Sequence, residues 1–223
     1  HLYLYDMVTG QVKNQITKGN WVWRSVENID TDKREISFTA SGYYPGQDPY
    51  YIHYFKVGLD GTGLMAYTFD DGTHKIEKSP DGQYYIDTFS RIDMPPVYQL
   101  RKTADGGLVC EIERADATAL IEAGWPVTEP FTAMSRDDKY EIWGIIHRPK
   151  NFDPNKKYPI IEDIYAGPHS NHVPKGWKGY DYWHQALAEL GFIVVQIDGM
   201  GTSNRSRDFH HFAWKNLADA GLP

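Results

Sequence analysis

Short runs of alternating apolar and polar residues follow one another along the first half of the chain, separated by Gly and Asp. A period of two puts successive side chains on opposite faces of a strand, so each run predicts a β-strand. Asp-Gly pairs between such runs favour hairpins, because the tight turn needs positive φ. The predicted strands include Leu2–Tyr5, Glu35–Thr39 and Ile52–Val57, and the pairs are Asp60-Gly61, Asp71-Gly72, Asp81-Gly82 and Asp105-Gly106.

A weak internal repeat runs through the same region. Ser25–Ala40 lines up with Lys75–Ser90, and in each segment a turn with an Asp, Asp32 or Asp81, leads into a strand that contains aromatic residues. A spacing of about 45–50 residues built from four short strands is typical of a β-propeller blade. The repeat therefore predicts antiparallel, all-β blades. Since two blades do not close a propeller, further blades are expected upstream of this chain.

The pattern changes after about Glu113. Runs with helical spacing and near-continuous apolar runs alternate there, which is the order of an α/β layer fold. In one predicted helix Trp183, Leu187 and Leu190 share a face, and Gly191 ends it. The predicted helices are Asp116–Ala123, Tyr182–Leu190 and Phe209–Leu217, and the predicted strands are Tyr140–His147, Tyr158–Tyr165 and Phe192–Ile197.

The composition narrows the classes of function. The 223 residues carry a formal net charge of −7 and no run of Lys or Arg, so no nucleic-acid partner is expected. No apolar run approaches the roughly 20 residues that a bilayer span needs, so no membrane span is expected in this chain. Cys110 is the single cysteine, which rules out an internal disulfide.

Three motifs stand in order along the chain. They are ITKGNW at Ile16–Trp21, KYPIIEDIYAGPHS at Lys157–Ser170 and GFIVVQIDGMGT at Gly191–Thr202. Together they resemble a blade turn, the strand that ends in Tyr-Ala-Gly-Pro, and the next parallel strand of dipeptidyl peptidase IV-like enzymes of the prolyl oligopeptidase family.

The resemblance implies a mixed fold. The expected domains are β-propeller blades in residues 1–113, an interdomain linker with a short helix in residues 114–130, and the N-terminal part of an α/β-hydrolase (peptidase) domain in residues 131–223.

The resemblance also implies a serine-peptidase mechanism of which this chain carries only a part. α/β-Hydrolases hold the nucleophile in a G-x-S-x-G turn, followed along the chain by an acid and a His. Gly201–Arg205 comes nearest to this pattern but lacks the closing Gly, so Ser203 is interpreted as a loop residue. By resemblance the nucleophile, the acid and the His lie beyond Pro223, and the chain alone is expected to be inactive.

Tyr165 is the candidate catalytic residue. In the family, the Tyr of Tyr-Ala-Gly-Pro donates its hydroxyl to the developing oxyanion, and that position is Tyr165 here. Gly167 and Pro168 are expected to shape the loop that presents the phenol. Asp198 ends the next strand, where capping of the following loop is the preferred interpretation.

One position departs from the family. Met200 stands where the family usually has Arg, and Arg205 and Arg207 are the nearby residues that carry a similar charge. The departure bears on the assignment to the dipeptidyl peptidases, and not on the hydrolase fold.

Four histidines raise the question of a metal site. His169 and His172 are three residues apart, and His210 and His211 are adjacent. No HExxH pattern or Cys pair accompanies them, so neither a metal nor a cofactor is expected.

The predicted function of the intact protein is that of a serine exopeptidase that removes dipeptides from the N-termini of peptides, often after Pro. An oligopeptidase or acylaminoacyl-peptidase of the same architecture, and a non-catalytic propeller protein with a decayed hydrolase layer, are the alternatives. The expected partner is a peptide substrate, and open sheet edges favour a homodimer. The resemblance implies a periplasmic or secreted location.

Overall fold

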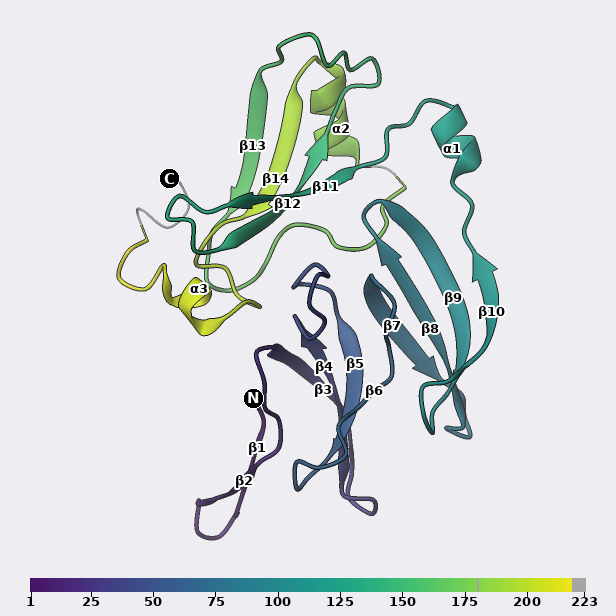
Figure 1. The fold of residues 1–223 in the computed structure, drawn as a ribbon, viewed down its shortest axis with the longest axis vertical. Coiled ribbons are helices and arrows are strands. Elements are labelled where there is room, and N and C mark those ends of the chain that lie inside the picture. The colour runs from purple at the N-terminus through teal and green to yellow at the C-terminus, as the bar shows by residue number, and fades with distance from the viewer. Residues whose placement is uncertain (180, 218–223) are drawn as a thin grey trace. The chain divides into compact units, whose positions relative to one another are not determined.

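The computed structural model describes residues 1–179 and 181–217, which belong to two compact units. Unit 1 comprises His1–Phe89 and Val97–Arg114, and unit 2 comprises Ser90–Pro96 and Ala115–Pro223. Figure 1 shows that antiparallel sheets make up most of the chain and that helices are few and short. The alternating sequence pattern predicts this composition.

Apart from Ser90–Pro96, which belongs to unit 2, one two-stranded and two four-stranded sheets make up unit 1. The small sheet pairs β1 (Tyr3–Tyr5) with β2 (Val12–Gln15). In each four-stranded sheet, strands that are neighbours in sequence are also neighbours in space. The first sheet consists of β3 (Val22–Asp30), β4 (Glu35–Ser41), β5 (His53–Gly58) and β6 (Met65–Ala66), and the second of β7 (Thr73–Lys78), β8 (Tyr84–Arg91), β9 (Met94–Lys102) and β10 (Leu108–Arg114).

The internal repeat corresponds to the first hairpin of each four-stranded sheet. Ser25–Ala40 covers most of β3 and β4, and Lys75–Ser90 covers most of β7 and β8. Three of the four Asp-Gly pairs form hairpin turns as predicted, with Gly at positive φ: Gly61 at 86°, Gly82 at 69° and Gly106 at 73°.

The fourth Asp-Gly pair was wrongly predicted to close a hairpin. Asp71-Gly72 lies between β6 and β7, so it connects one sheet to the next. A turn residue pair signals a change of direction but does not say whether the next strand joins the same sheet.

Stacked aromatic rings form the core of the β3–β6 sheet. The ring centroids of Trp21 and Phe38 lie 5.8 Å apart, and those of Phe38 and Phe55 lie 5.6 Å apart. Both phenylalanines are buried. The Trp21 indole also rests on Gly19, where a Cβ would meet its Nε1 at 2.4 Å. The motif ITKGNW therefore needs a residue without a side chain at this place.

A buried polar network lies beside this core in unit 1. His74 Nδ1 is 2.8 Å from Asp87 Oδ1, and the Asp87 carboxylate also faces Arg101 at 3.5 Å. The ring of His53 lies 4.8 Å from that of His74. Burial, and after it the neighbouring His74, lowers the pKa of His53 to about 3. His53 is therefore neutral across the physiological pH range.

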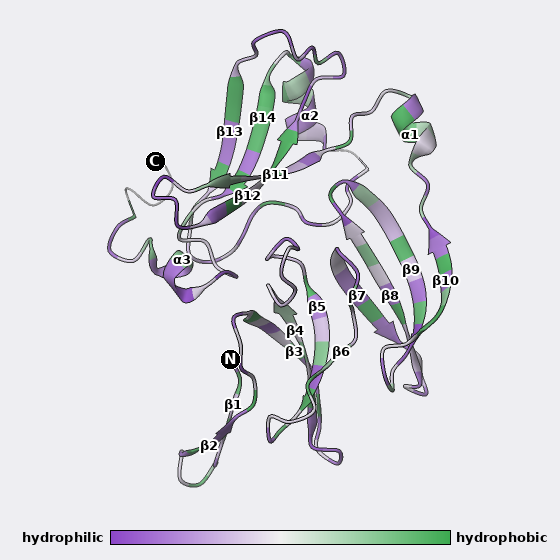
Figure 2. Ribbon diagram, in the orientation of Figure 1, coloured by the Kyte–Doolittle hydropathy of each residue, from purple (hydrophilic) through white to green (hydrophobic). Residues whose placement is uncertain are grey.

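Unit 2 is built around a mixed four-stranded sheet with the order β11 (Glu129–Met134), β12 (Glu141–His147), β14 (Ile193–Asp198) and β13 (Ile160–Tyr165). β12 pairs antiparallel with both β11 and β14, whereas β13 and β14 are parallel. Figure 2 shows both parallel strands as largely hydrophobic with a polar interruption in the middle. The three helices are α1 (Thr118–Glu122), α2 (Tyr182–Glu189) and α3 (Arg207–His211).

The predicted helix Phe209–Leu217 is wrong in its bounds. Helix α3 begins earlier because the Ser206 hydroxyl accepts a hydrogen bond from the Phe209 N–H at 3.2 Å, which caps Arg207–His211. After it the chain forms turns, and Lys215 has a φ of 58° that no helix contains.

Helix α2 has the predicted bounds, but the apolar residues noted on it are not its packed face. Trp183 and Leu190 are 82% and 76% exposed, whereas Gln185 and Ala188 are buried. The small side chain of Ala188 permits a close approach to the sheet, and Gln185 Nε2 donates to the Arg148 carbonyl at 3.1 Å. Side-chain size and a polar contact therefore decide which face packs.

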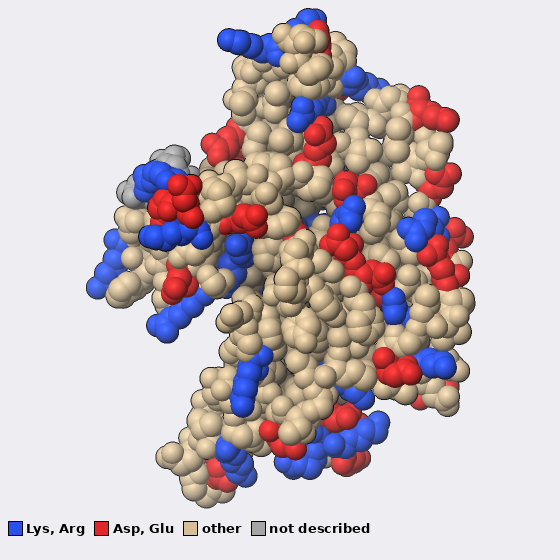
Figure 3. Space-filling view, in the orientation of Figure 1, with Lys and Arg blue, Asp and Glu red and all other residues tan. Residues whose placement is uncertain are grey.

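Charges of both signs are intermixed on the face of the molecule that Figure 3 shows. In the part of the chain that the structure describes, none of the helices has the length and apolarity of a membrane-spanning helix.

The low pKa of His53 predicts that acid weakens the fold. The unfolded chain protonates this imidazole near pH 6.5, whereas the folded chain does so only near 3, so the free energy of unfolding falls as the pH drops below 6.5. Between pH 7 and pH 5 we expect His53→Gln, which does not titrate, to lose about 2 kcal/mol less than the wild type. Urea unfolding at the two pH values measures the difference, and equal losses would contradict the prediction.

Candidate functional site

The candidate site lies where β13 and β14 end side by side. Their parallel register pairs Tyr165 with Asp198, so both side chains start from the carboxyl edge of the sheet. The Gly199 N–H donates to the Tyr165 carbonyl at 2.9 Å and holds the two strand ends together. Crevices beyond the carboxyl ends of parallel strands are where α/β sheets bind ligands.

Tyr165 is half-buried and its phenol rests on the loop that follows β13. A Cβ at Gly167 would lie 2.8 Å from the Tyr165 hydroxyl and 2.9 Å from Cζ. A side chain at position 167 would therefore displace the phenol, and glycine does not. This contact agrees with the expectation that Gly167 shapes the presentation of Tyr165, while the oxyanion role of Tyr165 stays a prediction.

Asp198 is completely buried and binds the loop of the neighbouring strand. Its carboxylate accepts hydrogen bonds from the N–H of His172 at 2.5 Å and from the N–H of Val173 at 3.2 Å. The expectation that Asp198 caps the loop after its own strand is thus corrected, since it holds the loop after β13. Burial raises the pKa of Asp198, and the two backbone hydrogen bonds oppose that rise.

Asp163 connects several polar side chains in the middle of β13. Its Oδ2 lies 2.9 Å from His184 Nε2, 3.2 Å from His172 Nε2 and 3.1 Å from Gln196 Nε2. Partial burial raises the pKa of Asp163, but the interactions with the two histidines together outweigh it, so the pKa is lowered. This carboxylate is ionised at neutral pH and orients both imidazoles.

The loop after β14 contains the residues at which the sequence departs from the family motif. Met200 is buried. Arg205 donates from Nη1 to the Glu141 carbonyl at 3.1 Å and lies 4.7 Å from the Phe209 ring, so it binds at the start of β12. Ser203 lies in the loop as predicted, where its N–H donates to the Ser170 carbonyl at 3.2 Å.

Two family profiles match this chain. Residues 1–96 match the dipeptidyl peptidase IV (DPP IV) N-terminal region, and residues 179–223 match the prolyl oligopeptidase family. The chain belongs to the dipeptidyl peptidase IV-like prolyl oligopeptidase family.

Similar proteins from fungi and bacteria align with nearly the whole length of this chain. Dipeptidyl peptidase 4 of Arthroderma otae is 26% identical over 97% of the chain, and that of Trichophyton tonsurans is 28% identical over 97%. The crystal structure of Porphyromonas gingivalis dipeptidyl peptidase 4 matches 97% of the chain with a TM-score of 0.74 and 25% identity. The chain spans 28% of the length of both fungal relatives and 30% of the crystallised chain.

The histidine pairs noted in the sequence have separate roles in this dipeptidyl peptidase IV-like chain. His172 contacts Asp163, and His210 Nε2 lies 2.9 Å from the Pro168 carbonyl. Among the described residues, neither pair belongs to a group of three potential metal ligands.

A different group of three potential metal ligands lies together in the structure, and the sequence pattern did not reveal it. His147, Asp181 and His184 each place one potential ligand atom within 4.8 Å of the other two. His147 is separated from the other two by more than thirty residues, about the length of a βαβ unit, so no short motif joins them.

Removal of the Asp198 carboxylate is expected to weaken unit 2. Asp198→Ala leaves the buried Val173 N–H without its acceptor, which costs about 1–3 kcal/mol of unfolding free energy. Glu162→Ala, an exposed carboxylate on the same sheet, is the control and should change stability by less than about 0.5 kcal/mol. Urea denaturation compares them, and an unchanged midpoint for Asp198→Ala would count against the anchoring role.

Proposed function

We propose that this chain is part of a serine exopeptidase that removes dipeptides from the N-termini of peptides, often after Pro. The two family regions follow one another in the expected order, and relatives named dipeptidyl peptidase 4 align along 97% of the chain. Since the chain spans only 28% of their length, the proposed activity is that of the intact protein. The observation that carries the proposal is the Tyr165 phenol held on Gly167 at the carboxyl end of β13.

The proposed architecture assigns a role to each part of the chain. The sheets β3–β6 and β7–β10 are blades of a β-propeller in residues 1–113, residues 114–130 are the linker, and residues 131–223 begin an α/β-hydrolase domain. The strand-by-strand order of both sheets, the repeat between their first hairpins and the parallel β13–α2–β14 segment support this assignment. The last two linker residues, Glu129 and Pro130, already pair with β12.

In the proposed mechanism Tyr165 acts on the transition state of acyl transfer. When a nucleophile attacks the peptide carbonyl, its oxygen becomes an oxyanion, and a phenol O–H already aimed at that place stabilises it. The close fit of the ring against Gly167 restricts the orientations of the phenol before substrate arrives. The nucleophile, its general base and the acid that orients the base come, in this proposal, from the remainder of the intact peptidase.

Substitution of the phenol tests the proposal in the intact protein. Tyr165→Phe keeps the ring and removes the donor, so kcat for a dipeptide-amide substrate with Pro at its second position should fall about 10²-fold or more. The loss should appear mainly in kcat, because the hydrogen bond forms in the transition state. Unchanged kinetics would remove Tyr165 from the oxyanion hole.

Tyr158→Phe is the matched control in the same unit. The Tyr158 hydroxyl accepts a hydrogen bond from the Asp153 N–H at 2.8 Å, so its loss lowers stability and leaves kcat unchanged. Gly167→Ala is the complementary variant, because its Cβ would lie 2.8 Å from the Tyr165 hydroxyl and displace it. We expect Gly167→Ala to lower kcat in the same direction as Tyr165→Phe.

A further inference from the structure

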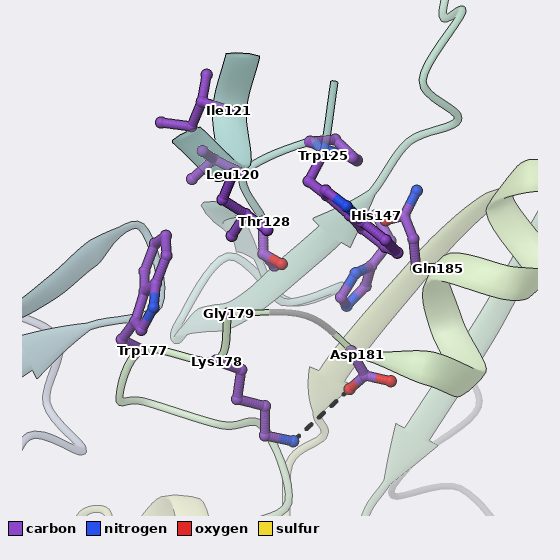
Figure 4. A pocket seen from close by; sticks show the side chains of 12 residues that line it. Leu120, Ile121, Trp125, Thr128, His147, Trp177, Lys178, Gly179, Asp181 and Gln185 are labelled. Atoms are coloured by element: carbon purple, nitrogen blue, oxygen red, sulfur yellow. Dashed lines mark ion pairs between the residues drawn. The ribbon is translucent and has the colours of Figure 1, made fainter. Parts of the chain in front are cut away.

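His147, Asp181 and His184 meet where the end of β12 lies against the start of α2. His147 is the last residue of β12, Asp181 is the N-cap of α2, and His184 is in the first turn of that helix. One potential ligand atom from each lies within 4.8 Å of the others. Figure 4 shows His147 and Asp181 lining the same small pocket in unit 2.

The imidazole of His147 has a buried nitrogen that nothing in the described chain satisfies. His147 is 3% exposed, and its Nε2 has no hydrogen-bond partner. His184 Nδ1 is likewise buried without a hydrogen bond, 3.2 Å from Asp181 Oδ1. A buried unpaired polar atom costs about 1–3 kcal/mol, so His147 Nε2, grouped with a second imidazole and a carboxylate, points to a missing partner. Asp181 is an acceptor and each neutral imidazole offers one lone pair, so a cation is a partner that all three groups can bind.

The surroundings prepare His184 for such a role. Its other nitrogen, Nε2, lies 2.9 Å from Asp163 Oδ2, and a carboxylate at this place orients most metal-binding histidines. A proton on Nε2 leaves the lone pair of Nδ1 directed towards Asp181. The carboxylate of Asp181 is held in turn by the Trp183 and His184 N–H groups, which donate to Oδ1, and by Lys178, 3.6 Å from Oδ2.

His147 lies directly against His184, the other histidine of the group. The two imidazole rings stack with centroids 5.2 Å apart and an interplanar angle of 17°.

We infer that His147 Nε2, His184 Nδ1 and Asp181 Oδ1 form a binding site for a divalent transition-metal ion, with Zn²⁺ as the ion that this donor set suits. Two imidazoles and one carboxylate are frequent zinc ligands, and three protein ligands leave a fourth position for water. Ligand atoms around tetrahedral zinc lie roughly 3.3 Å apart, given Zn–ligand distances of about 2.0 Å, so the three side chains draw together on binding. The inference goes beyond the proposed peptidase activity and does not depend on it.

Zinc titration of the intact protein tests the site directly. After the protein is stripped with a chelator and dialysed, isothermal titration calorimetry with Zn²⁺ should show one tight equivalent. His147→Ala and His184→Ala should each weaken that equivalent by more than about 100-fold. His169→Ala and His210→Ala remove histidines outside the cluster and should leave it unchanged.

Two further measurements separate ligation from a merely structural role. Asp163→Asn should keep the single equivalent and weaken it by about 10–100-fold, as loss of a partner that orients a metal-binding histidine does. Zn²⁺ should raise the Tm of the wild type but not of His147→Ala, since an ion that binds the folded state stabilises it.

The alternative is a doubly protonated His184 that bridges Asp163 and Asp181 without a metal. In that case the wild type takes up no zinc equivalent, or takes up one that survives in the His147→Ala/His184→Ala double variant. Either result overturns the inference, and because the first is read on the wild type it does not require the variants to fold.

Discussion

The buried carboxylate of Asp198 is the interaction on which the candidate site depends. It accepts hydrogen bonds from the N–H groups of His172 and Val173. Val173 in turn packs with Ile92 and Ile145 in a small core. The segment between Tyr165 and Val173 is thereby fixed at both ends, by the sheet and by this carboxylate. Its raised pKa reflects the cost of burying a charge, which the two hydrogen bonds only partly offset.

Glycines, which have no side chain, shape the candidate site as much as its side chains do. The phenol of Tyr165 occupies the place of a Cβ at Gly167. At Gly144 a Cβ would meet Phe131 at 2.5 Å and Ile197 at 2.6 Å, so β12 can lie between its two neighbours only without one. Gly201 has a φ of 101°, and a Cβ on it would lie 2.6 Å from the Ala213 Cβ, so the loop after β14 needs glycine for two reasons. The site is thus shaped by backbone that approaches other groups closely.

Sequence patterns predicted most of the elements, because strand alternation and turn residues are local properties. The strands around Phe38 and Phe55 and the hairpin turns at Gly61 and Gly82 were foreseeable from their neighbours in sequence. The parallel pair ending at Tyr165 and Asp198 was foreseeable only from the family resemblance of its two motifs. The sequence did not predict which hairpins share a sheet, because this depends on the whole chain (Figure 1). The start of α3 and the packed face of α2 were missed for a similar reason, since a capping hydroxyl and a small alanine outweighed apolar spacing.

The position of β13 has a consequence for whatever pairs with it. Among the described residues β13 is the outermost strand of its sheet, with one row of backbone donors and acceptors facing away from β14. A strand that adds to this row in the parallel sense runs in the direction of β13. Its carboxyl end then lies at the same edge of the sheet as Tyr165. The free edge of β13 therefore determines at which end of the sheet the loop after an added parallel strand begins.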